Sequence, residues 1–327
     1  MWFCGLASHS YVTEVLRETH GIRIAAEARK SARLVSMLAK DAVGLLDQAY
    51  SGPPEVSFLP LYYAVLNLSK IYIVAAGRRT ELDRNRHHGA TYNPAAKASH
   101  NLLTEEITLR PDGVLPLFYE VLTGQRHPWA GNRRLALKCV YPYILGVSVE
   151  YGFAYKQPEA LQPLTIQMEE APDSRFRYVL QLENTPHPKA FDRKHLRILA
   201  GLSIDSSRQH TYVTPYVRAA TPEEGHSLLS KTLRRCLIYT HDNAPFGVQI
   251  FRTPLSNQHI LLPQELPIWL AFFHLSNVVR YKPEYLFELA ESAAWPMLLA
   301  LSRHGILKYL LLSWSYIHQT SFAFSGS

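Results

Sequence analysis

The densest group of side chains that could do chemistry lies in one short connection after an apolar stretch. It comprises Arg78, Arg79, Arg84, Arg86, His87 and His88. Guanidinium groups hold phosphate oxygens in two-point hydrogen bonds, so we expect the four arginines to contact nucleic-acid phosphates. The alternative is a plain solvated loop, because Glu81 and Asp83 alternate with the arginines and neutralise part of their charge.

The same connection predicts a catalytic group. Histidine exchanges a proton near neutral pH, and arginine stabilises the negative charge that develops on a phosphate during its transfer. Arg84, His87 and His88 could therefore cleave RNA without a metal ion. Whether the chain is an enzyme at all stays open at this point.

A second surface that could bind nucleic acid lies on two predicted strands. In RFRYVLQLE, residues 175–183, one face carries Arg175 and Arg177, and in HTYVTPYVR, residues 210–218, one face carries Tyr212, Tyr216 and Arg218. If these faces adjoin, bases could stack on the tyrosines at roughly 1–3 kcal/mol each. The alternative is an ordinary half-exposed sheet with paired aromatic side chains.

Several common site classes are disfavoured. The sequence contains no GxxxxGK[ST], GxGxxG, HExxH, CxxC or GxSxG pattern, which disfavours an NTPase, a dinucleotide enzyme, a zincin and an α/β hydrolase. Cys4, Cys139 and Cys236 lie too far apart for a metal knuckle and are odd in number. We therefore expect no metal, no cofactor and a reduced, cytoplasmic location.

Composition indicates a folded, basic protein. With 47% hydrophobic and 19% charged residues among 327, the chain can bury a full core. Its formal charge of +7 favours an acidic partner, with RNA or DNA as the main candidates.

The elements that must position these side chains begin with two helices. Residues 22–50 have the apolar spacing of a long amphipathic helix, and a Gly-Pro-Pro segment ends it. Residues 58–76 are apolar nearly all round, which predicts a buried central helix. Residues 263–281 repeat that pattern, so we expect the two apolar helices to pack together.

Neither of the two most apolar segments is predicted to span a membrane. Residues 58–76 carry Lys70 near their centre, and residues 295–317 carry Arg303 and Lys308. Charged side chains cost about 2.5–3.5 kcal/mol each at mid-bilayer. We expect both segments to be core helices.

Between the helical segments, residues 164–252 alternate apolar and polar side chains at period two, as antiparallel strands do. The predicted fold class is α+β, with a helical domain formed by the N- and C-terminal segments and a β-rich antiparallel-sheet insertion. The predicted domains are residues 1–158, 159–258 and 259–327.

Four segments resemble the YaaC-like family of bacterial proteins. They are PLYYAVLNLSKIYIV at 60–74, HHG at 87–89, DGVLPLFYEVL at 112–122 and LPIWLAFFHLSNVVRYKPEYL at 266–286. The resemblance implies a HEPN-like helical portion, and with it a role in RNA cleavage or in antiviral defence or stress. HEPN ribonucleases have four to six residues between an arginine and the histidine that follows it. Arg235 with His241 and Arg252 with His259 fit that spacing, but so basic a chain with 15 histidines produces such pairs by chance.

Two functions remain as predictions. The first is a non-enzymatic module that associates with nucleic acid or with partner proteins in a bacterial defence or stress system. For protein partners, the apolar residues 309–324 could supply a docking helix. The alternative is a metal-independent, HEPN-like ribonuclease.

Overall fold

The computed structural model describes residues 2–92, 102–156, 161–182, 202–235, 248–251 and 262–319. The chain forms two compact units, one made of residues 1–158 with 265–320 and the other of residues 159–264 with 321–327. The first is mostly helical and joins both ends of the chain, and the second contains the larger sheet. The predicted α+β fold class, with a helical domain built from both ends and a β-rich insertion, is confirmed.

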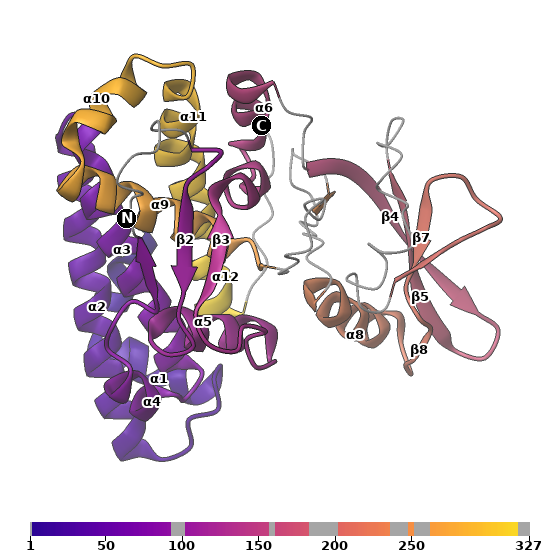
Figure 1. The fold of residues 1–327 in the computed structure, drawn as a ribbon. Coiled ribbons are helices and arrows are strands. Elements are labelled where there is room, and N and C mark those ends of the chain that lie inside the picture. Colours follow the sequence, from indigo (N-terminus) through magenta and orange to yellow (C-terminus); the bar gives the residue numbers. More distant parts are fainter. Residues whose placement is uncertain are drawn as a thin grey trace. The chain divides into compact units, whose positions relative to one another are not determined.

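Two long helices lie side by side in the first unit (Figure 1): α2, Ala25–Ser51, and α3, Pro54–Ala75. Gly52 and Pro53 between them leave room for no more than a tight reversal. Helix α9, Glu265–Tyr281, packs on α3, and the ring of Tyr62 meets Trp269 and Phe273 edge-on at 5.5 and 5.6 Å. The early and late apolar helices therefore share one core, in which each large side chain contributes about 1.5–3 kcal/mol.

Shorter helices surround this pair. Helix α12, Ile306–His318, is tied to α3 by a 2.7 Å hydrogen bond between the hydroxyls of Tyr309 and Ser69. It also buries Leu312 and Ile317, so the described part of the predicted docking helix belongs to the core, and residues 320–324 lie outside the described residues. The surrounding helices are α1, His9–Glu18; α4, Arg79–Arg84; α5, Val114–Thr123; α6, Ser148–Tyr155; α10, Pro283–Ala290; α11, Trp295–Ala300; and α12, Ile306–His318.

One helix in the described part of the chain, α3, is long and apolar enough to cross a membrane by length and composition. In the structure, 78% of its most apolar window is buried inside the protein. Such burial is typical of a core helix, and the prediction of no membrane contact stays a prediction.

A three-stranded antiparallel sheet also belongs to the first unit. Its strands are β1, Ala90–Tyr92; β2, Glu106–Leu109; and β3, Arg133–Ala136, in the order β1-β2-β3. The sequence predicts a short strand at residues 106–110, where β2 lies. The apolar residues 135–151 predict a helix that Pro142 breaks or kinks, and this prediction is wrong over most of its length. Pro142 lacks an N–H, and Gly146 has φ of +80°. This stretch therefore forms the end of β3, two short 3-10 turns and the start of α6.

The second unit contains a six-stranded antiparallel sheet in the order β6-β7-β5-β4-β9, with β8 also paired to β5. Helix α8, Pro222–Arg235, packs closely on it, because a Cβ at Gly225 would meet the Phe176 ring at 2.8 Å. The strands are β4, Leu161–Ala171; β5, Arg175–Leu182; β6, Ser203–Ile204; β7, Thr211–Val213; β8, Val217–Arg218; and β9, Val248–Phe251.

The single strand predicted over residues 210–218 is split into β7 and β8. Pro215 cannot donate to a ladder. Just before it, Thr214 bonds Tyr178 twice, since its N–H donates to the Tyr178 carbonyl at 3.0 Å and its Oγ1 accepts from the Tyr178 N–H at 2.9 Å. The sequence also predicts a strand over residues 236–241, which lie outside the described residues.

Candidate functional site

The loop that carries His87 and His88 is fastened to the start of α5. Its carbonyls at His87 and His88 accept hydrogen bonds from the N–H groups of Val114 and Leu115 at 2.9 and 3.0 Å. These are first-turn donors that have no partner inside the helix. A Cβ at Gly113, where φ is +107°, would lie 2.5 Å from His87 Nδ1. The glycine thus lets the histidine loop lie against the turn before α5.

His88 turns inward from this loop to the buried Tyr62 of α3. Its Nδ1 lies 2.6 Å from the Tyr62 hydroxyl. Burial lowers the pKa of His88, and the nearby positive charges of Arg280, Lys70 and His87 lower it further. The ring is therefore neutral at pH 7. When Nδ1 carries the proton and donates it to Tyr62 Oη, Nε2 presents a free lone pair.

Two cations approach this pair from the apolar helices. Lys70 stands eight residues after Tyr62, which places it on the same face of α3. Arg280, in the last turn of α9, lies 5.2 Å from the centre of the Tyr281 ring, and its Nε donates to the Ser276 carbonyl at 3.1 Å. Burial raises the pKa of Tyr62 strongly, and the charge of Arg280 opposes that rise. Arg280 thus acts on both members of the pair.

The other histidine of the loop, His87, faces solvent. His87 Nε2 lies 3.2 Å from Asp112 Oδ2, and both side chains are about half exposed. The two adjacent histidines thus differ in surroundings, one beside a carboxylate and one beside cations.

One of the predicted phosphate-binding arginines, Arg78 just before α4, has close acidic partners. Arg78 bonds Glu81 at 2.5 Å and Glu120 at 2.8 Å, and its hydrogen bond with Glu81 raises its pKa. Such two-point carboxylate contacts favour a structural role. For Arg78, these contacts support the alternative that acidic neighbours neutralise its charge.

Acidic side chains hold the other three arginines less tightly. Arg79 lies 3.6 Å from Glu27 and 3.9 Å from Asp83, and the exposed Arg86 lies 3.9 Å from Asp83. Arg84 is exposed, and its charge acts on Glu81. The largest charges that act on His88 are those of Arg280, Lys70 and His87. The charge of Arg280, and not that of Arg84, is therefore among those that lower the pKa of His88.

The predicted sheet face in the second unit is assembled in part. The guanidinium carbons of Arg175 and Arg177 lie 5.2 and 4.9 Å from the ring centre of Tyr216, which is 39% exposed. Arg218 is exposed and lies opposite Arg175 in the β5–β8 ladder. Tyr212, in contrast, is 1% exposed, so it offers no ring to a ligand.

A buried polar network was missed by the sequence patterns. Glu105 Oε2 accepts hydrogen bonds from Tyr92 at 2.5 Å and from His274 Nε2 at 2.7 Å, and the other ring nitrogen of His274 lies 3.1 Å from the Tyr141 hydroxyl. His274 is 0% exposed. The only signal in the sequence was a single histidine inside a largely apolar helix. Because the His274 ring is closed off from solvent, this network is suited to stability more than to catalysis.

Metal ligands do not gather in the described ranges, where no three side chains of His, Cys, Asp or Glu could hold one ion. The arginine-to-histidine spacings at residues 235–241 and 252–259 extend outside the described residues.

A family model described as YaaC-like Protein matches residues 5–317. No curated protein and no solved structure matches the chain. Tyr62, His88, Gly113 and Arg280 come from four separate segments that resemble the family, and the structure brings them together around one histidine.

Proposed function

The chain belongs to the YaaC-like family, and from that premise we propose that it associates with nucleic acid through the sheet of its second unit. We propose further that it does so in a bacterial defence or stress system, where protein partners would join the same assembly. Its net charge of +7 suits a polyanion.

The observation that carries the proposal is the stacking of Arg175 and Arg177 on the half-exposed ring of Tyr216. Single-stranded nucleic acid binds where an aromatic ring for a base stands beside cations for the backbone. Guanidinium groups that already lie over the ring lose little further freedom when a base and its phosphate arrive.

The acids around this group set its strength. Asp173 pairs with Arg175 at 2.6 Å, and Glu169 pairs with Arg177 at 2.7 Å. Part of the positive charge is thereby neutralised, so we expect modest affinity with strong dependence on salt.

The test is fluorescence anisotropy with single-stranded RNA and DNA oligonucleotides over a series of salt concentrations. We expect Tyr216→Ala to weaken binding by about 1–3 kcal/mol. Replacing Arg175 and Arg177 by glutamine should lower the salt slope by about 0.7 for each phosphate that the protein then leaves unneutralised. Tyr50→Ala is the matched control, because Tyr50 is also an exposed tyrosine and lies in α2. Absence of binding at low salt, or an equally large effect in the control, would refute the proposal.

A second candidate function, metal-independent RNA cleavage by a HEPN-like helical unit, is favoured by a different observation. His88, Tyr62, Arg280 and Lys70 place a neutral imidazole beside two cations. Nε2 of His88 would take the proton of a ribose 2′-hydroxyl. That oxygen would then bond to the adjacent phosphorus while the bond from phosphorus to the 5′-oxygen breaks.

The remaining roles follow from charge. Arg280 and Lys70 would stabilise the additional negative charge on the phosphate oxygens. His87, held by Asp112 at 3.2 Å, would give a proton to the departing 5′-oxygen. The products would be a 2′,3′-cyclic phosphate and a free 5′-hydroxyl. Arg84, exposed on α4, would serve in this scheme as a contact to the RNA backbone.

Incubation with RNA in EDTA tests this candidate. We expect cleavage that falls at least about tenfold in His88→Asn and in Arg280→Gln. His9→Asn, a substitution on α1, is the control. A lack of cleavage, or cleavage that His88→Asn leaves unchanged, would remove the ribonuclease and leave the binding proposal untouched.

A further inference from the structure

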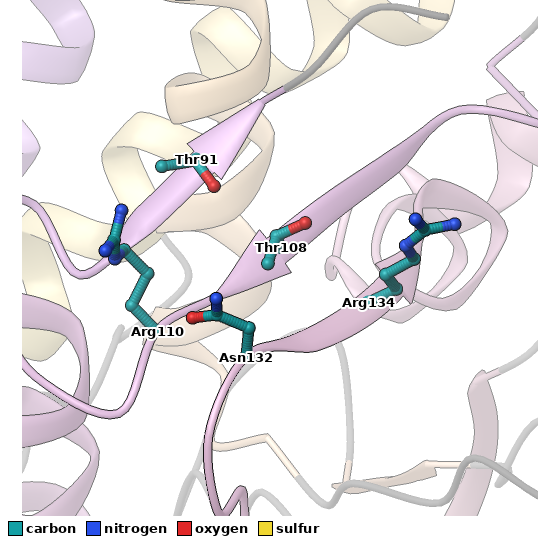
Figure 2. A pocket seen from close by; sticks show the side chains of 5 residues that line it. All are labelled: Thr91, Thr108, Arg110, Asn132 and Arg134. Atoms are coloured by element: carbon teal, nitrogen blue, oxygen red, sulfur yellow. The ribbon is translucent and has the colours of Figure 1, made fainter.

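A polar pocket lies on the three-stranded sheet of the helical unit (Figure 2). Its volume is about 450 Å³, within the range of roughly 300–1,000 Å³ that is usual for small-ligand sites. Arg110 and Arg134 stand on either side of the group, with Thr108 and Asn132 between them. The pocket is lined by Thr91, Thr108, Arg110, Asn132 and Arg134.

Strand register explains why these side chains gather. Thr91 pairs with Thr108, and Thr108 pairs with Arg134, so one outward row crosses all three strands. Continuing the β2–β3 register by one residue sets Arg110 opposite Asn132 just past the ladder. The alternate positions point inward, as at Ile107 and Leu135, which are buried. A core on one face therefore produces a polar array on the other.

Arg110 is held by its backbone while its side chain stays available to a ligand. Its N–H donates to the Gly89 carbonyl at 3.0 Å, and its own carbonyl accepts from Trp129 Nε1 at 2.7 Å. Within the described residues, no carboxylate lies within ion-pair distance of its guanidinium, which is exposed. The fixed backbone aims the guanidinium over the sheet, and that limits the entropy lost on binding.

Arg134 has one weak competitor. Its Nη1 lies 3.8 Å from Glu106 Oε2, and the two side chains are 77% and 42% exposed. An exposed pair of this length contributes roughly 0–1 kcal/mol. A ligand with a higher charge density than a carboxylate can therefore displace Glu106 from Arg134.

The chemistry of the lining selects the ligand. Two guanidiniums, an amide and two hydroxyls supply many donors, while the lining has no carboxylate and no aromatic ring on which a base could stack. We propose that this pocket binds a phosphomonoester, with its terminal oxygens held between Arg110 and Arg134. A phosphomonoester has three terminal oxygens and close to two negative charges. It can therefore accept hydrogen bonds from two guanidinium groups at once. A phosphodiester offers one charge and fits less well.

The group could come from a free nucleotide or from the 5′ end of a nucleic acid. Calorimetry with AMP, with adenosine as its matched control, tests the first source. Anisotropy with a 5′-phosphorylated oligonucleotide, compared with the same sequence bearing a 5′-hydroxyl, tests the second. This inference does not rest on the proposed function, because AMP binding requires neither Tyr216 nor RNA cleavage.

We expect AMP, the 5′-phosphorylated oligonucleotide or both to bind more tightly than the unphosphorylated control. Arg110→Gln and Arg134→Gln should each weaken that binding at least roughly tenfold, because each removes the charge-assisted hydrogen bonds of one guanidinium group. Arg17→Gln, at an exposed arginine of α1, removes the same charge elsewhere and should bind as the unaltered protein does. Glu106→Gln should bind more tightly, because it releases Arg134.

Two results would overturn the proposal. One is that neither phosphorylated probe binds better than its control. The other is that the arginine variants bind as well as the unaltered protein while circular dichroism shows all of them folded.

Discussion

Two histidines of the helical unit, His88 and His274, each lie close to a tyrosine hydroxyl, yet their surroundings differ. His274 Nε2 bonds Glu105 at 2.7 Å, and Nδ1 lies 3.1 Å from the Tyr141 hydroxyl. His88 bonds Tyr62 through Nδ1 at 2.6 Å, and its Nε2 has no hydrogen-bond partner among the described residues. The first ring is enclosed on both nitrogens, and the second keeps one nitrogen for a ligand.

The electrostatic surroundings also differ. Burial by itself raises the pKa of Glu105, but hydrogen bonds from His274, Tyr92 and Tyr285 outweigh burial, and the net pKa is lowered. The charge of that carboxylate is therefore balanced inside the core. Around His88, the largest charges are positive. An enclosed, balanced network favours stability, whereas an open ring nitrogen beside cations favours an anionic ligand.

Removing the carboxylate of the enclosed network should have the largest effect. Glu105→Ala leaves the Tyr92 hydroxyl and His274 Nε2 buried without their acceptor, and each buried donor left unsatisfied costs about 1–3 kcal/mol. The free energy of unfolding can be measured by denaturant titration with tryptophan fluorescence. This signal reports on the helical unit, because every tryptophan belongs to it: Trp2, Trp129, Trp269, Trp295 and Trp314.

The neighbouring Glu106 supplies the control for this prediction. It is exposed and pairs with Arg134 at 3.8 Å, so Glu106→Ala should change stability by about 0.5 kcal/mol or less. Equal effects of the two substitutions would contradict the structural role of the Glu105 network.

The pH dependence of the same network has a definite sign. The lowered pKa of Glu105 means that the folded protein keeps this carboxylate charged more readily than the unfolded chain does. Its contribution is full above its ordinary pKa of 4.5 and is lost as the pH falls through the lower folded value. In Glu105→Ala, the free energy of unfolding should therefore fall less steeply as the pH drops below 4.5.

Sequence periodicity was sufficient for the apolar helices but not for what lies between them. Residues 58–76 and 263–281 are apolar over most of their circumference, and both form buried core helices, α3 and α9. Strand β3 was missed, because four residues with two exposed or half-exposed arginines carry almost no periodic signal. The pocket on its sheet therefore could not be predicted.

Reasoning from the sequence could group only residues that lie close together along the chain. Arg84 and His88 are close in sequence, and this closeness suggested that they act together. Arg280 lies far away in sequence and reaches His88 because α9 packs on α3. The packing of α9 on α3 is a tertiary contact, and spacing within a loop gives no information on it.

A smaller effect is expected at the open histidine. Tyr62→Phe keeps the ring packed against Trp269 and Phe273 but removes the hydroxyl that bonds His88. The loss of one such hydrogen bond costs about 0.5–1.5 kcal/mol. Tyr63→Phe, at the next residue of α3, is the control and should change stability less. If Tyr62→Phe destabilised the protein as much as Glu105→Ala, the distinction between the two histidines would fail.

The smallest expected effect is on the pKa of His88, and it distinguishes the influence of Arg280 from that of Arg84. The positive charge of Arg280 helps lower the pKa of His88, so Arg280→Gln should raise that pKa toward its ordinary value of 6.5. Arg84→Gln should leave it nearly unchanged. The measurement is an NMR titration of the His88 ring signal, assigned by its loss in His88→Asn.

The sign of this shift also determines its effect on stability. With a lowered pKa, His88 contributes stability in full above pH 6.5, and this contribution is lost as the pH falls through the folded value. Arg280→Gln brings the folded pKa closer to that of the unfolded chain, so this part of the acid sensitivity should shrink. A larger pKa change from Arg84→Gln than from Arg280→Gln would show that the loop arginine, and not the helix α9, controls the histidine. The catalytic group would then be the one that loop spacing alone suggested.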